Sequence, residues 1–357
     1  MTKARTYTLF FLLAVVGLLV GRHLSDAIDR QTPEIVLQVG QHLVTGKVSP
    51  DGRYLAGIGR KDNFWFAQVW DIQGRVVMGP QSLVTPHGRF HGFDWHPGSQ
   101  KLAVSAGNEV WVFQVKNGKK TVLAASEQVR TIEYDGPFLM ARARTATFVW
   151  KDDKTKPFWR LDQGYLLHST LNGKTGRLAT ACFDDGVRVF DLQKKRQLSH
   201  FHPGVTSAGL KFDSSGSLLA SGFRNRGNRR TDHILVHNLE SGKPAGPTLT
   251  TPRLFGYQFS TDGRTVVSRQ QAGAFVWRVD DGKNIAHREG QSTLIDDISD
   301  DGNWVATVPG GGMVRIWSTQ KNEEYKLLAE QPVSDVRFSG PGRLLAVGGQ
   351  ATLWRVP

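Results

Sequence analysis

One short phrase, a polar turn that ends in glycine and leads into an apolar run, recurs along this chain and constrains its fold more than any other feature. It reads SPDGRYLAGIG from Ser49, DSSGSLLASG from Asp213, STDGRTVVS from Ser260, SDDGNWVAT from Ser299 and SGPGRLLAVGG from Ser339. A tight hairpin turn usually needs a residue that tolerates a positive φ, and glycine does. The turn glycines are Gly52, Gly98, Gly136, Gly176, Gly216, Gly263, Gly302 and Gly342. The chain therefore contains eight repeats with a period of about 40 residues.

An aromatic residue inside a second apolar run keeps the same period. These markers are Trp70, Trp111, Trp150, Phe190, Trp277, Trp317 and Trp354, with His237 in the fifth repeat. Within each repeat, short apolar runs alternate with clusters of Gly, Asp, Asn and Ser, which is the pattern of strands joined by hairpin turns. One small sheet cannot bury both faces alone, whereas a ring of such sheets can. We therefore predict an all-β fold, an eight-bladed β-propeller over residues 34–357.

Two segments resemble the WD-repeat signature, in which Trp or Phe precedes Asp at the end of the third strand: VWDIQG from Val69 and VFDLQK from Val189. FHPGVTSAGLKFDSSG from Phe201 is similar to the Gly-His segment of that family, although Phe201 replaces the glycine. The resemblance covers roughly residues 34–357 and implies a divergent WD-repeat propeller. Only two of the eight repeats keep the Asp, so the family's His–Asp hydrogen-bond network is not expected in most blades. Propellers of this kind serve many unrelated tasks, so the resemblance specifies no function.

The two ends of the repeat region are predicted to share one blade. The sequence ends in TLWRVP, Thr352 to Pro357, the third strand of the eighth repeat, and an unpartnered run, EIVLQV from Glu34 to Val39, precedes the first complete repeat. Without that run the last strand would be a long exposed edge, which promotes aggregation. We expect Glu34–Val39 to pair antiparallel with Thr352–Val356 and to close the ring.

Residues 1–27 precede the repeats and form a predicted hydrophobic helix. Lys3 and Arg5 stand before TYTLFFLLAVVGLLVG, which carries no charge. Its 16 residues would span about 24 Å as a helix, less than the ~30 Å hydrocarbon core of a membrane. The step Ser25–Ala27 favours a cleaved signal peptide, and a snorkelling Arg22 is compatible with a signal-anchor transmembrane helix. Residues 28–33 are a predicted linker between this segment and the propeller. Both alternatives predict a membrane-anchored or secreted propeller, in the periplasm or at the cell exterior.

The formal net charge of +13 has two explanations, solvated lysines in hairpin turns such as KNGKK from Lys116, or an anionic counterpart. Nucleic-acid binding would need basic residues interleaved with exposed aromatic residues on one surface, and an exported protein rarely meets nucleic acid. Anionic lipid headgroups, an acidic polysaccharide or an acidic protein fit better. We expect a protein partner or an anionic polymer, membrane association through the N-terminal segment, and no nucleic acid.

No motif in the sequence identifies a reaction. It contains no G-x-S-x-G nucleophile elbow and no Walker A or G-x-G-x-x-G phosphate loop. His87, His91 and His96 lack the spacing of metal ligands on a strand, and the adjacent Asp pairs are expected to stabilise turns. Cys182, the only cysteine, is expected to be buried. We therefore predict no cofactor, no metal and no enzyme. An enzyme would need a buried cluster of titratable groups with shifted pKa values at the propeller axis.

Two segments between second and third strands are longer than the others, in blades one and five, which are opposite in an eight-fold ring. The first contains Arg60, Lys61, Phe64 and Trp65, and the second contains Arg224, Arg226, Arg229 and Arg230. One hypothesis is an aromatic patch and an arginine patch that flank the channel and bind an acidic partner, and the alternative is two solvated insertions.

The sequence therefore favours a non-catalytic protein-interaction scaffold, displayed on the extracytoplasmic side of a membrane. Two alternatives stay open. The first is an exported hydrolase or lyase with its polar residues at the channel mouth, and the second is an assembly factor for envelope proteins.

Overall fold

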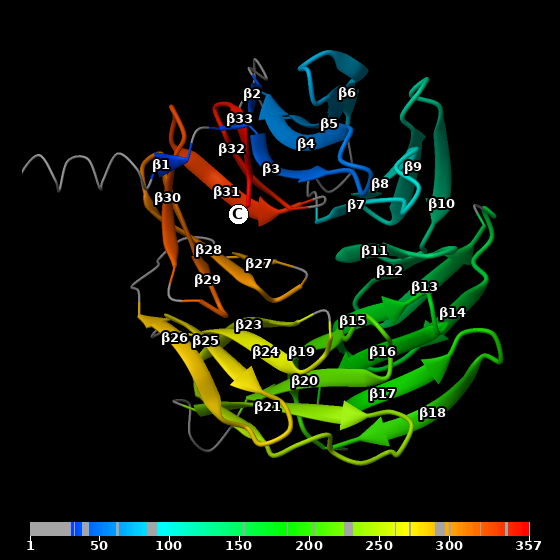
Figure 1. Ribbon diagram of the computed structural model, residues 1–357. Helices are drawn as coiled ribbons and strands as arrows, with labels where there is room; N and C mark the ends of the chain where they lie inside the picture. The colour runs from blue at the N-terminus through cyan, green and yellow to red at the C-terminus, as the bar shows by residue number, and fades with distance from the viewer. Residues whose placement is uncertain are drawn as a thin grey trace, which may run out of the picture.

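The computed structural model describes residues 30–31, 33–37, 43–61, 64–83, 91–152, 154–183, 185–202, 204–224, 231–260, 262–270, 273–289, 297–299, 301–321, 323–339 and 342–356. In these ranges the chain folds into strands and turns, and the strands form eight sheets. The sheets stand around a central axis as the blades of a propeller (Figure 1). No helix in the described ranges is long and apolar enough to cross a membrane. The predicted N-terminal helix over residues 1–27 lies outside the described residues.

Blades one to four follow the chain in order, each as an antiparallel sheet. Blade one consists of β3 (Leu43–Val48), β4 (Tyr54–Lys61), β5 (Phe64–Asp71) and β6 (Val76–Ser82). Blade two consists of β7 (Phe93–Trp95), β8 (Lys101–Ala106), β9 (Glu109–Gln114) and β10 (Lys120–Ala124). Blade three consists of β11 (Thr131–Asp135), β12 (Phe138–Arg142), β13 (Ala146–Lys151) and β14 (Trp159–Asp162). Blade four consists of β15 (Leu166–Asn172), β16 (Arg177–Cys182), β17 (Gly186–Asp191) and β18 (Arg196–Phe201).

Blades five to eight complete the ring, and the last two also take strands from the start of the chain. Blade five consists of β19 (Ser207–Phe212), β20 (Leu218–Arg224), β21 (Thr231–Asn238) and β22 (Leu249–Pro252). Blade six consists of β23 (Leu254–Phe259), β24 (Thr265–Gln270), β25 (Gly273–Arg278) and β26 (Asn284–Glu289). Blade seven consists of β27 (Asp297–Ile298), β28 (Trp304–Gly310), β29 (Met313–Ser318), β30 (Glu324–Leu328) and β1 (Arg30–Gln31). Blade eight consists of β31 (Val333–Phe338), β32 (Arg343–Gly348), β33 (Ala351–Arg355) and β2 (Ile35–Leu37).

The recurring Ser-x-Asp-Gly phrase is a turn between the first and second strands that its own side chains close. In blade one, Ser49 Oγ donates to Asp51 Oδ1 at 2.6 Å and accepts from the Tyr54 N–H at 3.0 Å. Gly52 has φ 72°, a left-handed conformation that favours glycine. The same side-chain bonds recur at Ser260, Asp262 and Thr265, and at Ser299, Asp301 and Trp304. In blade two the positive φ falls on Ser99 and not on the predicted Gly98.

The third strand of each blade carries one large side chain opposite the second residue of the second strand. Seven of these side chains are the predicted markers. Trp277 is half-buried, and the other six are buried: Trp70, Trp150, Phe190, His237, Trp317 and Trp354. In blade two, Phe113 pairs with Leu102 and is the equivalent residue, whereas Trp111 pairs with Val104. The marker predicted at Trp111 is therefore wrong by two positions. Residues two apart lie on the same side of a strand, so the sequence pattern did not separate them.

The aspartates of the two WD-like dipeptides close the next hairpin. Asp71 Oδ1 accepts the N–H groups of Gln73 at 3.0 Å and Arg75 at 2.9 Å. Asp191 Oδ1 accepts the N–H of Lys194 at 2.9 Å. This local turn bond explains why a short acidic side chain follows the aromatic residue in these blades.

The predicted closure of the ring is confirmed, over a shorter stretch than expected. β2 pairs antiparallel with β33, with Ile35 opposite Leu353 and Leu37 opposite Ala351. The Glu34 carboxylate pairs with Arg343 at 3.0 Å and Arg355 at 3.4 Å, and its hydrogen bond from Arg343 holds the pKa of Glu34 below its usual value. Gln38 and Val39 lie outside the described residues.

The apolar core lies between neighbouring blades. One cluster joins Leu43 and Trp70 of blade one to Leu345 and Leu353 of blade eight, and includes Leu37 of the closing strand. Equivalent clusters join the other neighbours, such as blades two and three. Each sheet is therefore stabilised by the next one, and the first strands are held around the axis.

Candidate functional site

The two faces of the ring present different segments. The turn face, as we call it, carries the Ser-x-Asp-Gly turns and the hairpins between third and fourth strands. The loop face carries the hairpins between second and third strands and the connections from one blade to the next. Because Leu43 is paired with Gly59 and Val48 with Leu55, the Lys61–Phe64 hairpin lies at the end of blade one remote from its Ser-x-Asp-Gly turn.

The predicted aromatic patch lies on the loop face of blade one, but it belongs to an extended hairpin. Arg60 pairs with Trp65 and Lys61 with Phe64, so the additional residues lengthen β4 and β5 to 8 residues each. Arg60, Lys61 and Phe64 are exposed, with Phe64 at 57%, while Trp65 packs against the core between blades one and two. The expected long loop is therefore a pair of longer strands, which holds these side chains in a defined order.

The predicted arginine patch is only partly described. β20 ends at Arg224, and β21 begins at Thr231. Arg226, Arg229 and Arg230 lie outside the described residues, as does the side chain of Arg224. Blades one and five are opposite in the ring, as predicted (Figure 1).

Further aromatic residues on the loop face were not predicted. Tyr165 and Phe183 of blade four contact edge to face with ring centroids 6.3 Å apart, and the Arg144 guanidinium lies 5.0 Å from the Tyr165 centroid. In blade six, the Arg253 guanidinium lies 5.7 Å from the Phe255 centroid. These aromatic residues stand at strand ends in the fourth and sixth repeats, and no local motif connects the two groups.

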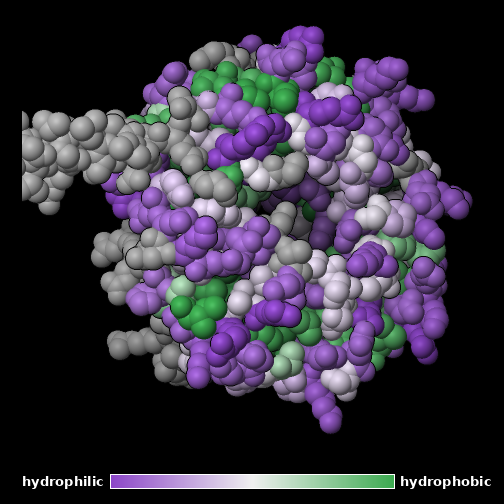
Figure 2. Space-filling view, viewed as in Figure 1, coloured by the Kyte–Doolittle hydropathy of each residue, from purple (hydrophilic) through white to green (hydrophobic). Residues whose placement is uncertain are grey.

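The exposed large apolar side chains of the described residues separate into two sets. One set lies on the outer strands of the blades: Val36, Val76, Val122, Leu198, Ile285 and Leu328. The other set lies at the loop-face ends of strands: Val44, Phe64, Tyr165, Phe183, Val205 and Phe255. Figure 2 shows one face of the molecule, with hydrophobic residues scattered among hydrophilic ones around a central hollow. The second set supplies every exposed aromatic residue of the two, and we call it the loop-face apolar set.

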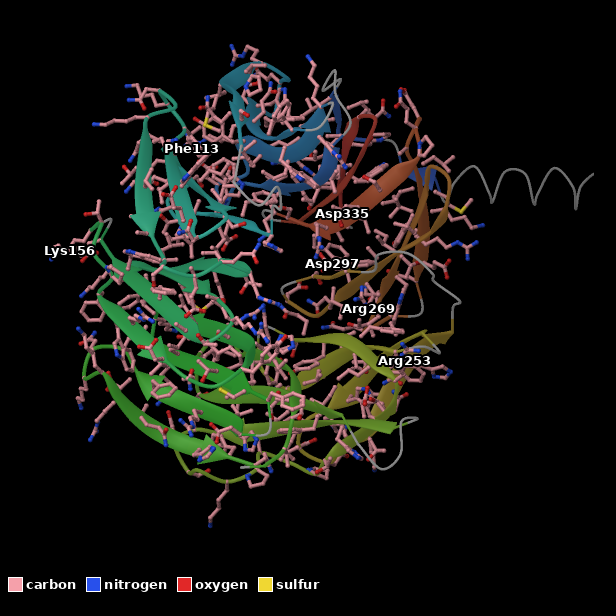
Figure 3. All side chains as sticks on the ribbon, turned by 180° about the vertical axis from the view of Figure 1, so that it is seen from behind. Phe113, Lys156, Arg253, Arg269, Asp297 and Asp335 are labelled. Atoms are coloured by element: carbon pink, nitrogen blue, oxygen red, sulfur yellow. The ribbon has the colours of Figure 1, made fainter. Side chains whose placement is uncertain are left out.

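A cavity of about 1180 Å³ occupies the axis toward the turn face. Its wall is formed by the first strands of the blades, and Figure 3 shows Asp297 and Asp335 near the axis. One residue from each first strand, next to the apolar residue at the strand end, forms what we call the axial ring. Its members are Lys47, Asp94, Glu133, Thr170, Lys211, Gln258, Asp297 and Arg337.

Three of the six charged residues of the axial ring, Lys47, Asp94 and Asp297, join neighbouring blades. Lys47 Nζ binds Asp94 at 2.9 Å, and Asp94 also accepts the Tyr134 N–H of blade three at 2.9 Å. Burial alone would lower the pKa of Lys47, but the Asp94 carboxylate outweighs it and raises this pKa. Asp297 accepts the Phe338 N–H of blade eight at 2.8 Å. Asp297, which was expected in or next to a turn, lies in a first strand that ends just before the Ser299 turn, and its side chain bonds to the next blade.

Glu133 is different, because in the described part of the chain its carboxylate accepts no backbone N–H and forms no salt bridge. Its Oε1 accepts a hydrogen bond from Thr170 Oγ1 at 3.2 Å. Removal from bulk water raises the pKa of Glu133 to about 7, with a contribution from Asp94, while Lys211 and Thr170 act in the opposite direction. A carboxyl group that titrates near neutral pH in an axial cavity is the feature that an enzyme with this fold would need.

The histidines and the cysteine do not form a site in the described residues. Among these residues, no group of three or more His, Cys, Asp or Glu side chains is placed to hold a metal ion. His96 Nδ1 accepts the Gly98 N–H at 2.9 Å, and His87 lies outside the described residues. Cys182 is buried in β16, as predicted, and burial raises the pKa of its thiol to about 11. His202 and His237 are neighbours with ring centroids 5.1 Å apart.

The comparisons with known proteins concern the fold. No family model matches this chain, and no curated protein matches its sequence. The crystal structure of the computationally designed Ika8 protein superposes with a TM-score of 0.70 at 15% sequence identity, and the match covers 91% of this chain and 100% of that one. A likeness at this identity shows the fold alone. The protein is therefore an eight-bladed β-propeller.

Proposed function

We propose that this protein is a WD-repeat-type, non-catalytic interaction module that binds an acidic protein partner on its loop face, outside the cytoplasm. The observation that carries the proposal is the loop-face apolar set together with its arginines. Aromatic side chains beside arginines are the composition of binding hot spots, because they supply contact area and directed hydrogen bonds. The outer strands carry exposed aliphatic residues but no exposed large aromatic residue among those described.

The chemistry of the partner follows from the charges around this set. Arg60, Lys61, Arg144 and Arg253 are exposed on the same face. A guanidinium group over an aromatic ring keeps N–H donors for a carboxylate, so an acidic segment with apolar residues would satisfy both kinds of group. The net charge of +13 would also accelerate the approach of such a partner at low ionic strength.

The extracytoplasmic location is supported by the sequence of residues 1–27. β1 places Arg30 at the outer edge of blade seven, where it pairs with Lys326. The chain thus joins the ring at its rim and not at its axis. A reporter that is active only outside the cytoplasm, fused after Pro357, should be active, and a reporter that is active only in the cytoplasm should be silent; the opposite result would exclude export.

The partner proposal is tested by co-purification from the membrane fraction with a loop-face variant. Phe64→Ser, Tyr165→Ser and Phe255→Ser are combined, and the matched control combines Val76→Ser, Val122→Ser and Ile285→Ser on the outer strands, where exposure is similar. The loop-face variant should lose about tenfold or more of an acidic partner, while the control keeps it and both melt as the wild type does. Equal recovery with the two variants would contradict the proposal.

One observation favours a second candidate, an exported hydrolase or lyase that uses the axial cavity. Glu133, with its pKa of about 7, has the protonation behaviour of a general acid or base. An activity screen on the full chain, with Glu133→Gln as the inactive reference, separates the two functions. Turnover by the wild type that is lost in Glu133→Gln would favour the enzyme. Equal turnover by the wild type and Glu133→Gln would count against it.

A further inference from the structure

Two charged groups at the axis are not used to hold the propeller together. Nine charged residues line the axial cavity, and seven of them make salt bridges or accept backbone N–H groups: Lys47, Asp94, Asp135, Asp297, Asp301, Arg337 and Arg343. The other two are Glu133 and Lys211. Within the described residues, Glu133 accepts only the Thr170 hydrogen bond, and Lys211 makes neither a salt bridge nor a side-chain hydrogen bond.

Glu133 and Lys211 line one compartment of the channel wall. It has a volume of about 220 Å³ and lies along the first strands of blades three to six, with Thr170, Asn172 and Gln258 as further polar residues. Thr170 of blade four stands between the two charges in the order of the axial ring. The compartment holds the volume of about seven water molecules, so it has room for a small solute.

The two charges attract each other across this compartment without forming an ion pair. Lys211 stabilises the ionised form of Glu133 electrostatically, yet the two side chains are not in salt-bridge contact. Charged groups in a cavity are costly unless they are paired, and the other charges of the axial ring are paired. An opposite pair that stays separated by a polar gap is complementary to a molecule that carries both charges.

We propose that this compartment binds a small zwitterionic molecule of the amino-acid class, with its ammonium group at Glu133 and its acidic group at Lys211. Thr170 holds the Glu133 carboxylate in place, and Asn172 and Gln258 line the same compartment as the two charges. A ligand with only one charge would leave the other protein charge unpaired in the cavity, which favours the zwitterion. The proposal does not rest on the loop face, which lies at the other end of the channel.

The protonation of Glu133 predicts how the affinity depends on pH. The ammonium group of the ligand binds the ionised carboxylate, and the pKa of free Glu133 is about 7. Binding at pH 7 should therefore release a proton from Glu133, and the affinity should fall as the pH is lowered from 8 to 6.

Calorimetric titration of the full chain in mild detergent tests the proposal. The probes are glycine, β-alanine, 4-aminobutyrate and 6-aminohexanoate, which separate the two charges by increasing lengths, and the single-charge analogues are butylamine and butyrate. At least one zwitterion should bind about tenfold or more tightly than both analogues, since tenfold corresponds to about 1.4 kcal/mol. Its binding enthalpy should vary with the ionisation enthalpy of the buffer, as proton release requires.

Four single variants then locate the site. Glu133→Gln and Lys211→Met should each weaken the best zwitterion by about tenfold or more. The matched controls Glu330→Gln and Lys156→Met remove exposed charges of the same kind and should bind as the wild type does. Melting temperatures are measured for all four, and Lys211→Gln replaces Lys211→Met if the latter unfolds.

Three results would overturn the proposal. One is that no zwitterion binds at millimolar concentration. The second is that butylamine or butyrate binds as tightly as the best zwitterion, and the third is that Glu133→Gln and Lys211→Met bind like their controls. The loop-face variant should bind the zwitterion as the wild type does, because its substitutions lie at the other end of the channel. A failure of the partner experiment therefore leaves this proposal standing, and the reverse also holds.

Discussion

Replacing His237 by Phe should stabilise the propeller and remove part of its sensitivity to acid. His237 occupies the position at which the other blades carry Trp or Phe, and it is 3% exposed. Its ring stacks on Phe201 with centroids 4.1 Å apart, and Nε2 has no hydrogen-bond partner in the described structure. Phe190 fills the equivalent position in blade four, so Phe suits both the shape and the polarity of the site.

The magnitude follows from the pKa of His237, which burial and the neighbouring His202 lower from 6.5 to about 4. The unfolded chain binds a proton below pH 6.5, while folded His237 stays neutral until about pH 4. The resulting penalty is absent above pH 6.5, reaches about 2 kcal/mol at pH 5 and about 3 kcal/mol at pH 4. An unpaired buried nitrogen adds a pH-independent penalty of about 1 kcal/mol or more.

Urea denaturation of the wild type and His237→Phe at several pH values between 4 and 8 measures both contributions. The variant should be more stable at every pH, and its advantage should increase as the pH falls below 6.5. His233→Phe, a half-buried histidine on the same strand, shows the effect of removing a histidine outside the buried site. A constant difference between pH 8 and pH 5, or a variant less stable than the wild type at pH 8, would refute the reasoning.

Three further changes have defined outcomes. Leu37→Ala removes a side chain of the closing strand that is 4% exposed and should lower the free energy of unfolding by about 2–4 kcal/mol in urea denaturation. Val36→Ala, at 36% exposure on the same strand, should cost less than half as much. Equal costs would contradict the role of Leu37 in closing the ring. Ser299→Ala removes the two hydrogen bonds of the Ser299 hydroxyl and should cost about 1–2 kcal/mol by the same assay. A cost near zero would show that the turn forms without these two bonds. The pKa of Glu133 rises from 4.5 to about 7 on folding, so wild-type stability should fall as the pH rises through this window. In urea denaturation, Glu133→Gln should be more stable than the wild type by up to about 3 kcal/mol at pH 8 and by little at pH 4.5. A stability difference that does not change with pH would contradict the pKa shift.

The fold was predictable because its information is local and repeated. The Ser-x-Asp-Gly turn carries its own hydrogen bonds, and the turn sets the register of the first two strands. Eight repeats at one period, three of them with this Ser-x-Asp-Gly turn, leave few ways to bury the apolar faces. The closing strand was predictable for a similar reason, because Glu34–Val39 had strand composition and the last strand had an open edge.

The side-chain environment within a strand was harder to predict. Trp111 and Phe113 are both aromatic and lie on the same side of β9, so periodicity does not show which one stands at the marker position. The pairing with Leu102 gives Phe113 that place and leaves Trp111 half-buried, where its Nε1 donates to Glu109 at 2.7 Å. The extended hairpin at Arg60–Trp65 was expected as a loop, because its length and not its pairing was visible in the sequence.

The sites depend on residues that are far apart in the chain. The position before each strand end reads Lys, Asp, Glu, Thr, Lys, Gln, Asp and Arg through the repeats, and this order is a property of the sequence. The convergence of these residues is a property of the tertiary structure, because it requires the first strands of eight blades to meet at one axis. Whether a charge there is paired, as in Lys47 and Asp94, or unpaired, as in Glu133 and Lys211, depends on distances between neighbouring blades. Local turn chemistry thus specified the blades, and only the packing of the blades against one another brought the charges of the axial ring together.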